Sequence, residues 1–371
     1  MVEAVDHAIT AFSPFPERSI RTYEDWHAYV AKPVPVKPAM PTYAAFKAMS
    51  QAEKKEFNRV RATYHCEFGP LLVPDMENIH NAGLRLARQN LRAQPGARPG
   101  VIMDGISTVG KSTIAMQLGR RYEKLITNEH TITRTPTGDV FVPVAFIALP
   151  GEVNIMNFNY LLADFYNIPF SKKSKEGELT KSIKQHAADC CTSMVIIDDI
   201  HFLRIKNRTH EIVNEHMKHL ANYISATFVY AGVNVKGSGF ITEGNNEEKA
   251  PFSQNAHRFK IFNLAPFNYH NDESKEQFLR VIAAFEDNLL LFNHRPHSLA
   301  EEVGEYIWTR TGGYMGPIAT LIREATDIAI KDGKERITKS ILQSIKLDSA
   351  SELHFRLRGK QREASAQKSK A

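Results

Sequence analysis

The stretch Val101-Ile-Met-Asp-Gly105-Ile-Ser-Thr-Val-Gly110-Lys111-Ser112-Thr113 decides the fold of this chain. It fits the phosphate-binding pattern G-x-x-x-x-G-K-[ST], with an apolar strand before it and a helical pattern after it. Gly105 and Gly110 let the backbone wrap so that N–H groups face phosphate oxygens, and the following helix adds a favourable dipole. Lys111 offers a positive charge to the outer phosphates, and the Ser112 hydroxyl is a Mg²⁺ ligand. The predicted nucleotide-binding residues are Gly105, Thr108, Val109, Gly110, Lys111, Ser112 and Thr113.

The composition is that of an ordinary soluble globular protein. The 371 residues are 43% apolar and 24% charged, which suggests two or three domains. No apolar run is long enough to span a membrane, and the N-terminus lacks the basic-then-apolar pattern of a signal peptide. Cys66, Cys190 and Cys191 give neither a disulfide framework nor metal-site spacing, so we expect a cytoplasmic protein with no membrane partner. The formal net charge of +6 is compatible with a nucleic-acid partner.

Five apolar segments separated by helical patterns predict a parallel sheet covered on both faces. They are Val101–Asp104, Val140–Leu149, Met194–Asp198, Thr227–Gly232 and Lys260–Leu264. After Pro266 the pattern is helical only. The expected helices are Glu276–Leu290, Leu299–Thr309, Pro317–Ile330 and Ile337–Leu347. The predicted fold class is α/β, a P-loop core with a five-stranded parallel sheet and a C-terminal helical lid.

We expect four parts along the chain: an N-terminal extension over 1–75, a nucleotide-binding α/β domain over 76–266, a helical lid over 267–350 and a basic, disordered tail over 351–371. In the extension, Ser50-Gln-Ala-Glu53 is a capping box that starts a helix with one apolar face. That face carries Phe57, Val60, Tyr64 and Phe68. Its partner lies either within the chain or on a neighbouring subunit. The tail is either solvated or in contact with DNA phosphates.

The second half of the predicted site is the end of the third strand, Ile196-Ile-Asp198-Asp199. A carboxylate at the tip of a buried strand, downstream of a phosphate loop, is typical of nucleoside triphosphatases. Asp198 can hold Mg²⁺, and Asp199 can orient or deprotonate the attacking water. The alternative for Asp199 is that it only caps the next element.

Two further residues are candidates for the chemistry. Asn234 follows the fourth strand, where its side chain can sense the terminal phosphate; the alternative is a plain turn residue. Arg258 precedes the fifth strand, where a cation at a subunit edge can reach a neighbour's phosphates and stabilise transition-state charge. The alternative for Arg258 is a surface cation.

This combination resembles the AAA+ ATPases, and within them the TniB/TnsC-type transposition regulators, with IstB and DnaA as more distant relatives. The resemblance covers roughly residues 70 to 345. The segments that carry it are Gly105–Thr113, Ile196–Leu203, Glu215–Asn222 with Ala226–Val233, His257–Phe259 with Leu264–Phe267, and Thr311–Pro317 ahead of Leu321–Ala325. In that family the Gly-Gly-x-x-Gly segment belongs to the lid that folds over the nucleotide.

The chain departs from the family pattern at three places. Asp199 stands where many AAA+ proteins carry Glu, and a shorter carboxylate has less reach as a base, so hydrolysis is expected and a slow rate is compatible with it. Gly316 occupies the place of a lid arginine. The usual sensor position aligns with either Val233 or Asn234.

The resemblance implies an ATP- and Mg²⁺-dependent ATPase that assembles as a ring or filament on double-stranded DNA. It also implies recruitment or activation of a DDE-type transposase and contact with a target-selection protein. The alternatives are a DnaA- or helicase-loader-like replication ATPase, a defence-type signalling ATPase, a small-molecule P-loop kinase and an ATP-binder that does not hydrolyse. The fifth strand, Arg258 and the helical lid argue against the kinase.

Overall fold

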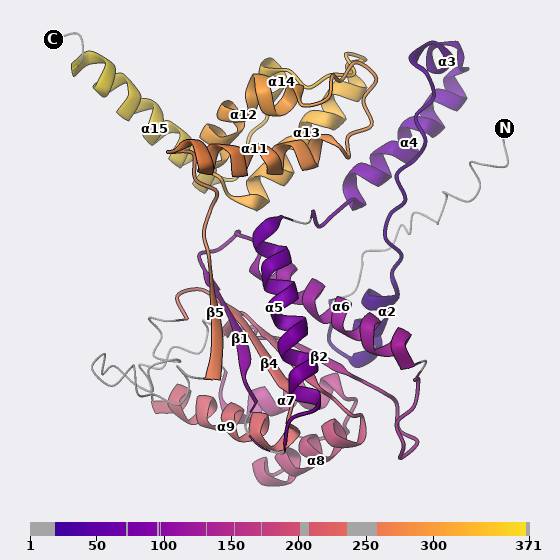
Figure 1. Ribbon diagram of the computed structural model, residues 1–371, viewed down its shortest axis with the longest axis vertical. Coiled ribbons are helices and arrows are strands. Elements are labelled where there is room, and N and C mark those ends of the chain that lie inside the picture. The colour runs from indigo at the N-terminus through magenta and orange to yellow at the C-terminus, as the bar shows by residue number, and fades with distance from the viewer. Residues whose placement is uncertain are drawn as a thin grey trace. The chain divides into compact units, whose positions relative to one another are not determined.

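A computed structural model describes residues 19–71, 73–94, 96, 98–130, 132–151, 153–171, 173–200, 208–235 and 258–368 (Figure 1). The described residues form two compact units. The nucleotide unit comprises residues 19–32 and 74–265, and the lid unit comprises residues 33–73 and 266–368. The predicted extension is thus shared between two separately packed bodies.

The nucleotide unit is built on a five-stranded, all-parallel sheet with the strand order β2-β3-β4-β1-β5. The strands are β1 (Gly100–Gly105), β2 (Val144–Ala148), β3 (Met194–Asp198), β4 (Thr227–Gly232) and β5 (Phe259–Leu264). Every residue of β3 and β4 is buried. Because successive side chains of a strand point to opposite faces, both faces of the sheet are covered. The predicted fold class is confirmed.

The second strand is shorter than its apolar segment. Val140 to Leu149 was expected to be extended throughout, but β2 begins only at Val144, directly after Pro143. Proline has no N–H to donate to a sheet. The Pro143 carbonyl instead accepts the N–H groups of Ser193 and Met194, each at 3.0 Å. This proline therefore marks where pairing with β3 starts.

Helices surround this sheet in two groups, and within each group the helices pack against one another (Figure 1). In the first group, α5 packs on α6, and both lie on the central strands. In the second, α7, α8 and α9 pack together, and α7 contacts β2. The bounds are α5 (Pro74–Leu91), α6 (Lys111–His130), α7 (Ile155–Phe165), α8 (Glu176–Asp189) and α9 (Arg208–Ile224).

The helix α2 (Tyr23–Ala31), from the N-terminal extension, belongs to the nucleotide unit. Its Trp26 is fully buried, and the indole Nε1 donates a hydrogen bond to Glu123 Oε2 of α6 at 2.8 Å. The same ring stacks on Phe146 of β2 at 5.6 Å between centroids. Burial raises the pKa of Glu123 to about 7, and the Trp26 hydrogen bond opposes this shift. The extension is therefore anchored on the helix that begins at Lys111.

The lid unit combines two helices of the extension with the C-terminal helices. They are α3 (Tyr43–Ala48), α4 (Gln51–Glu67), α11 (Asp272–Glu286), α12 (Ser298–Thr311), α13 (Met315–Lys331), α14 (Lys339–Ser344) and α15 (Ser349–Lys368). The capping box is confirmed, since Ser50 Oγ accepts the Glu53 N–H and the Glu53 carboxylate accepts the Ser50 N–H. Helix α11 begins earlier than its apolar pattern because Asn271 caps its N-terminus, and it ends at Glu286 instead of Leu290.

The partner of the apolar face of α4 is the lid unit of the same chain. Tyr64 and Phe68 are buried there, and α4 packs against α13. Arg61, also on α4, is fully buried and forms an ion pair with Glu335 at 2.6 Å. Its guanidinium lies 5.4 Å from the centroid of the Phe292 ring. The structure thus answers a question that the sequence left open.

The structure differs from the expectation of a disordered tail over 351–371, because α15 continues through Lys368. Its first turns are attached to α12: Arg310 Nη2 donates to Glu352 Oε1 at 2.7 Å, and the Arg358 guanidinium lies 4.0 Å from the centroid of the Trp308 ring. Six basic residues suggested a solvated segment, but these contacts between positions far apart in sequence give the helix a partner.

Candidate nucleotide site

The predicted phosphate loop joins β1, which ends at Gly105, to α6, which begins at Lys111. Gly105 lies so close to β5 that a Cβ atom there would come within 2.3 Å of the Leu264 carbonyl oxygen. Only glycine fits beside that strand. Gly110, at a φ of 93°, has a left-handed backbone that glycine adopts without strain. Thr108, also in the predicted binding set, has a φ of 63°, which is unusual for a β-branched residue.

Lys111 is buried, and its ammonium group donates a hydrogen bond to the Ile106 carbonyl oxygen at 2.6 Å. Burial lowers the pKa of Lys111, and the charges of Asp198, Asp199 and Asp104 oppose that shift. A lysine held between a loop carbonyl and nearby carboxylates is placed to exchange these contacts for phosphate oxygens.

The Ser112 side chain is hydrogen-bonded to Asp198, which ends β3. Burial raises the pKa of Asp198, while the Ser112 hydrogen bond and the Lys111 charge lower it. A hydroxyl and a carboxylate brought together are the protein ligands that Mg²⁺ takes beside nucleotide phosphates. Within the described residues there is no group of three or more His, Cys, Asp or Glu side chains suited to a metal.

Asp199 follows directly and has a left-handed backbone, with a φ of 58°. Its backbone N–H donates to Asp198 Oδ1 at 2.9 Å, which holds the Asp198 carboxylate against the Asp199 backbone. Asp199 is half-buried, at the carboxyl edge of the sheet. The rest of the segment that resembles the family, 201–203, lies outside the described residues.

Asn234 lies at the same edge, because β4 runs between β1 and β3. Its side chain is exposed, and its φ is 51°. Val233 before it is half-buried. The structure therefore brings together the phosphate loop, Asp198, Asp199 and the turn that carries Asn234.

Arg258 is the one predicted site residue that lies elsewhere. It directly precedes β5, whose Phe259 is paired with Gly100 at the start of β1, whereas Leu264 is paired with Gly105. Six strand residues span about 17 Å, so Arg258 lies at the opposite edge of the sheet from its own phosphate loop. Its Nη2 donates to Asn222 Oδ1 at the end of α9, at 3.1 Å. Residue 257, which also belongs to a segment that resembles the family, lies outside the described residues.

The lid segment is a turn between two helices. Gly312 ends α12 with a φ of 64°, Gly313 follows with a φ of 79°, and α13 begins at Met315. The Gly313 carbonyl accepts the Phe267 N–H at 2.9 Å, so two of the segments that suggested the family are in contact. Gly316 lies in the first turn of α13, so the position expected for a lid arginine carries no side chain.

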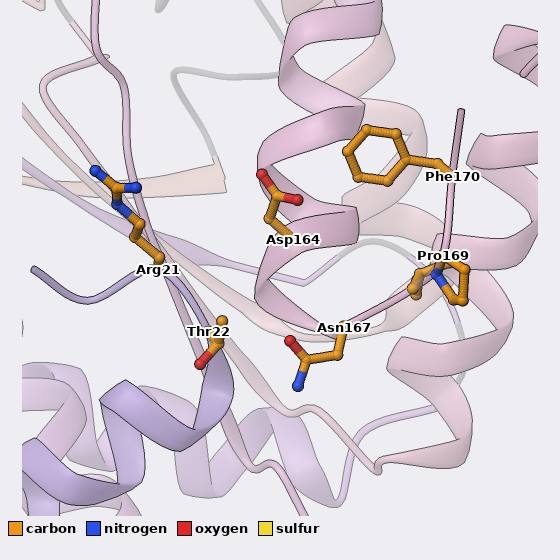
Figure 2. A pocket seen from close by; sticks show the side chains of 7 residues that line it. Arg21, Thr22, Asp164, Asn167, Pro169 and Phe170 are labelled. Atoms are coloured by element: carbon orange, nitrogen blue, oxygen red, sulfur yellow. The ribbon is translucent and has the colours of Figure 1, made fainter. Parts of the chain in front are cut away.

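Sequence reasoning missed Asp104, Asn222 and the anchoring of α2. Asp104 could have been noticed, since a carboxylate at the end of a buried strand is the signal that identified Asp198. The two residues that lead into α2 also line a hollow of about 580 Å³ on the nucleotide unit (Figure 2). The lining residues are Arg21, Thr22, Asp164, Asn167, Ile168, Pro169 and Phe170. None of them belongs to the predicted nucleotide site.

The fold and this arrangement of loops define a P-loop protein of the AAA+ class. Solved structures with this fold include the ORC2 protein of Aeropyrum pernix in ADPNP and ADP complexes, with a TM-score of 0.51 and 12% identity over 74% of this chain and 68% of that one. They also include the A. pernix ORC1 protein in complex with DNA, with a TM-score of 0.50 and 15% identity over 74% of this chain and 65% of that one. A third is the Cdc6p protein of Pyrobaculum aerophilum, with a TM-score of 0.50 and 14% identity over 73% of this chain and 66% of that one. The chain spans about two thirds of the length of these proteins, and identities this low show the fold alone.

The particular family follows from the sequence. Residues 79–268, just over half of the chain, match the family described as Bacterial TniB protein, and the chain belongs to that family. No curated protein sequence matches it. None of the described helices is both long and apolar enough to cross a membrane.

Proposed function

We propose that this protein is an ATP-dependent regulator of DNA transposition, an AAA+ ATPase that assembles on duplex DNA and recruits or activates a DDE-type transposase. The observation that supports the ATPase part is the hydrogen bond between Ser112 and Asp198, beside a buried Lys111 that lies within the electrostatic reach of Asp198 and Asp199. Membership of the TniB family supports the link to transposition.

In the proposed reaction, water attacks the terminal phosphorus of ATP, and the bond to the bridging oxygen breaks to release ADP and phosphate. Lys111 binds the outer phosphates, and Asp199 orients the water and accepts its proton. Ser112 and Asp198 would hold Mg²⁺, which neutralises phosphate charge when bound. Asn234 would sense the terminal phosphate.

Arg258 is proposed to act on the site of a neighbouring subunit. Its place at the far edge of the sheet from its own phosphate loop supports action in trans. A cation supplied in this way stabilises transition-state charge and makes hydrolysis depend on assembly. ATP would then lie between subunits, so that binding builds the assembly and hydrolysis dismantles it.

Contact with DNA is supported by the positive charge of the chain. The chain has a formal net charge of +6 and an isoelectric point near 9.0. Arg356 is exposed on α15, within the basic C-terminal segment. One structure of the same fold, that of the A. pernix ORC1 protein, contains DNA. We therefore propose phosphate contacts that weaken as salt is added.

The proposed function is tested by mixing two inactive variants. Lys111→Ala should abolish nucleotide binding, and Arg258→Ala should keep binding but lose hydrolysis by on the order of a thousandfold. In a mixture, an Arg258→Ala subunit offers an intact phosphate loop to the intact arginine of a Lys111→Ala neighbour. Partial recovery of ATP turnover is therefore expected.

The control is Arg59→Ala, which removes an exposed arginine on α4 that pairs only locally with Glu56. Its turnover should equal that of the wild type. A mixture that assembles without recovering turnover would contradict action in trans, and unchanged hydrolysis by Arg258→Ala alone would leave Arg258 as a surface cation.

A further inference from the structure

Asp104 is a buried carboxylate for which the site described above has no role. It is 8% exposed and is the residue of β1 directly before Gly105. Burying a carboxylate costs free energy unless hydrogen bonds or opposite charges compensate it. Its contacts therefore indicate what the residue does.

One contact is a buried hydrogen bond to the turn after β4. The Val235 N–H donates to Asp104 Oδ1 at 2.9 Å, and Val235 is itself 1% exposed. In the sheet, Asp104 is paired with Gly232, the last residue of β4. The chain thus leaves the sheet after Gly232, and three residues later the Val235 N–H is hydrogen-bonded to Asp104 of β1.

Asn234 lies between these two attachment points. Its backbone is left-handed and its side chain is exposed, directly beside the residue that Asp104 holds. The backbone position of Asn234 is consequently held by the attachments of Gly232 and Val235 on either side of it. Because β1 continues into the phosphate loop, the same carboxylate ties that turn to the strand that carries the loop.

The second contact is electrostatic. Asp104 is one of three carboxylates whose charge opposes the lowering of the pKa of Lys111 by burial. Its negative charge is therefore felt where the phosphates are proposed to bind. This charge acts on every bound nucleotide, whereas the Val235 hydrogen bond acts through the position of Asn234.

We propose that Asp104 is a positioning residue: it holds the Asn234–Val235 turn against the phosphate loop so that Asn234 can distinguish a nucleoside triphosphate from a diphosphate. This rests on the proposed nucleotide site and adds to it a residue that sets the discrimination between the two nucleotides. The hydrogen bond, and not the charge, is the part that matters for that discrimination.

Substitutions separate the two effects. Asp104→Asn keeps an acceptor oxygen and removes the charge, whereas Asp104→Leu and Asp104→Ala remove both. Loss of the charge should tighten binding of both nucleotides, and of the more highly charged triphosphate at least as much, so it should not reduce the preference for the triphosphate. Loss of the hydrogen bond should remove the preference for the triphosphate. Asn234→Gly removes the sensing side chain and keeps a backbone that accepts a positive φ.

The experiment measures the affinities of fluorescent ADP and of a fluorescent, slowly hydrolysed ATP analogue for the full chain. We expect the wild type to prefer the ATP analogue, and Asp104→Leu or Asp104→Ala to reduce that preference about tenfold, a modest coupling for one buried hydrogen bond. Asp104→Asn should retain most of it. In the Asn234→Gly background, Asp104→Leu should cause no further loss.

Several results would overturn the assignment. They are a normal preference in a folded Asp104→Leu or Asp104→Ala protein, an equal loss in Asp104→Asn, or losses that add in the double variant. Thermal unfolding identifies variants that are folded, and Asp104→Ala is the second truncation should Asp104→Leu not fold. If the wild type binds no nucleotide, the proposed function fails and this role fails with it. If the wild type binds and discriminates while the variants do likewise, only the role of Asp104 fails.

Discussion

At the scale of single residues, the carboxyl edge of the sheet depends on backbone conformations that most side chains avoid. Asp199 and Asn234 have φ values of 58° and 51°. Asp and Asn are the side chains that most readily adopt this left-handed region apart from glycine. At position 199 this gives a physical reason for Asp where many AAA+ proteins carry Glu, since a longer side chain would have to bear the strain of a positive φ.

A substitution at position 199 separates the two roles considered for it. Asn tolerates the same backbone and caps helices as well as Asp, so a capping role predicts normal hydrolysis in Asp199→Asn. A role as base predicts that nucleotide binding and assembly persist while hydrolysis slows by about a hundredfold or more. We expect the second result, measured as phosphate release at saturating ATP. If Asp199→Asn hydrolysed ATP at the wild-type rate, Asp199 would have only the capping role.

At the scale of elements, the sequence predicted best what depends on local patterns. The bounds of β3 and β4 agree with the apolar segments because each is a short run of buried residues between polar ends. The location of the predicted site followed from one topological rule, which is that the carboxyl ends of neighbouring parallel strands lie at the same edge of the sheet. Thus Asp198 and Asn234 could be placed near the phosphate loop from sequence.

Contacts between distant positions could not be predicted in this way. Arg61 is expected to be exposed by its residue type, yet it is buried because Glu335, which is far away in sequence, neutralises it. The hydrogen bond from Val235 to Asp104 and the anchoring of Trp26 by Glu123 belong to the same class. None of these pairs has a spacing that marks it. The polar composition of α15 likewise gave no sign of its contacts with α12.

A buried histidine of α4 predicts how the stability of the protein depends on pH. His65 is buried, and its Nε2 accepts the Leu290 N–H at 2.9 Å. Burial, with a smaller effect of Arg61 and Lys37, lowers the pKa of His65 to about 4. The unfolded chain therefore binds a proton below the ordinary pKa of about 6.5 that the folded chain does not bind. Stability should fall as the pH drops from 6.5 towards 4, by up to about 3 kcal/mol from this residue.

His65→Gln tests this contribution. Glutamine can accept the Leu290 hydrogen bond and does not titrate, so the variant should lose less stability than the wild type between pH 7 and pH 5. The free energy of unfolding from urea titrations at the two pH values measures the difference. His80 and His216, whose pKa values burial also lowers to about 4, affect both proteins equally. Identical slopes for wild type and variant would mean that His65 does not contribute.

At the scale of the whole molecule, the proposed nucleotide site would lie where subunits of the proposed assembly meet. The chain has its phosphate loop at the carboxyl end of its sheet strands and Arg258 at the opposite end. This polarity suits head-to-tail contacts, which generate rings or helical filaments. Duplex DNA could then act as the support on which nucleotide-bound subunits gather.

The most direct test of the central claim is the particle size of the purified protein with a slowly hydrolysed ATP analogue, with and without duplex DNA, by light scattering and electron microscopy. ATP hydrolysis is measured on the same samples. The account predicts large assemblies that need both nucleotide and DNA, that dissolve with added salt and that do not form with Lys111→Ala. A particle of constant size that hydrolyses ATP equally well with and without DNA would contradict it, and would favour a signalling or metabolic ATPase.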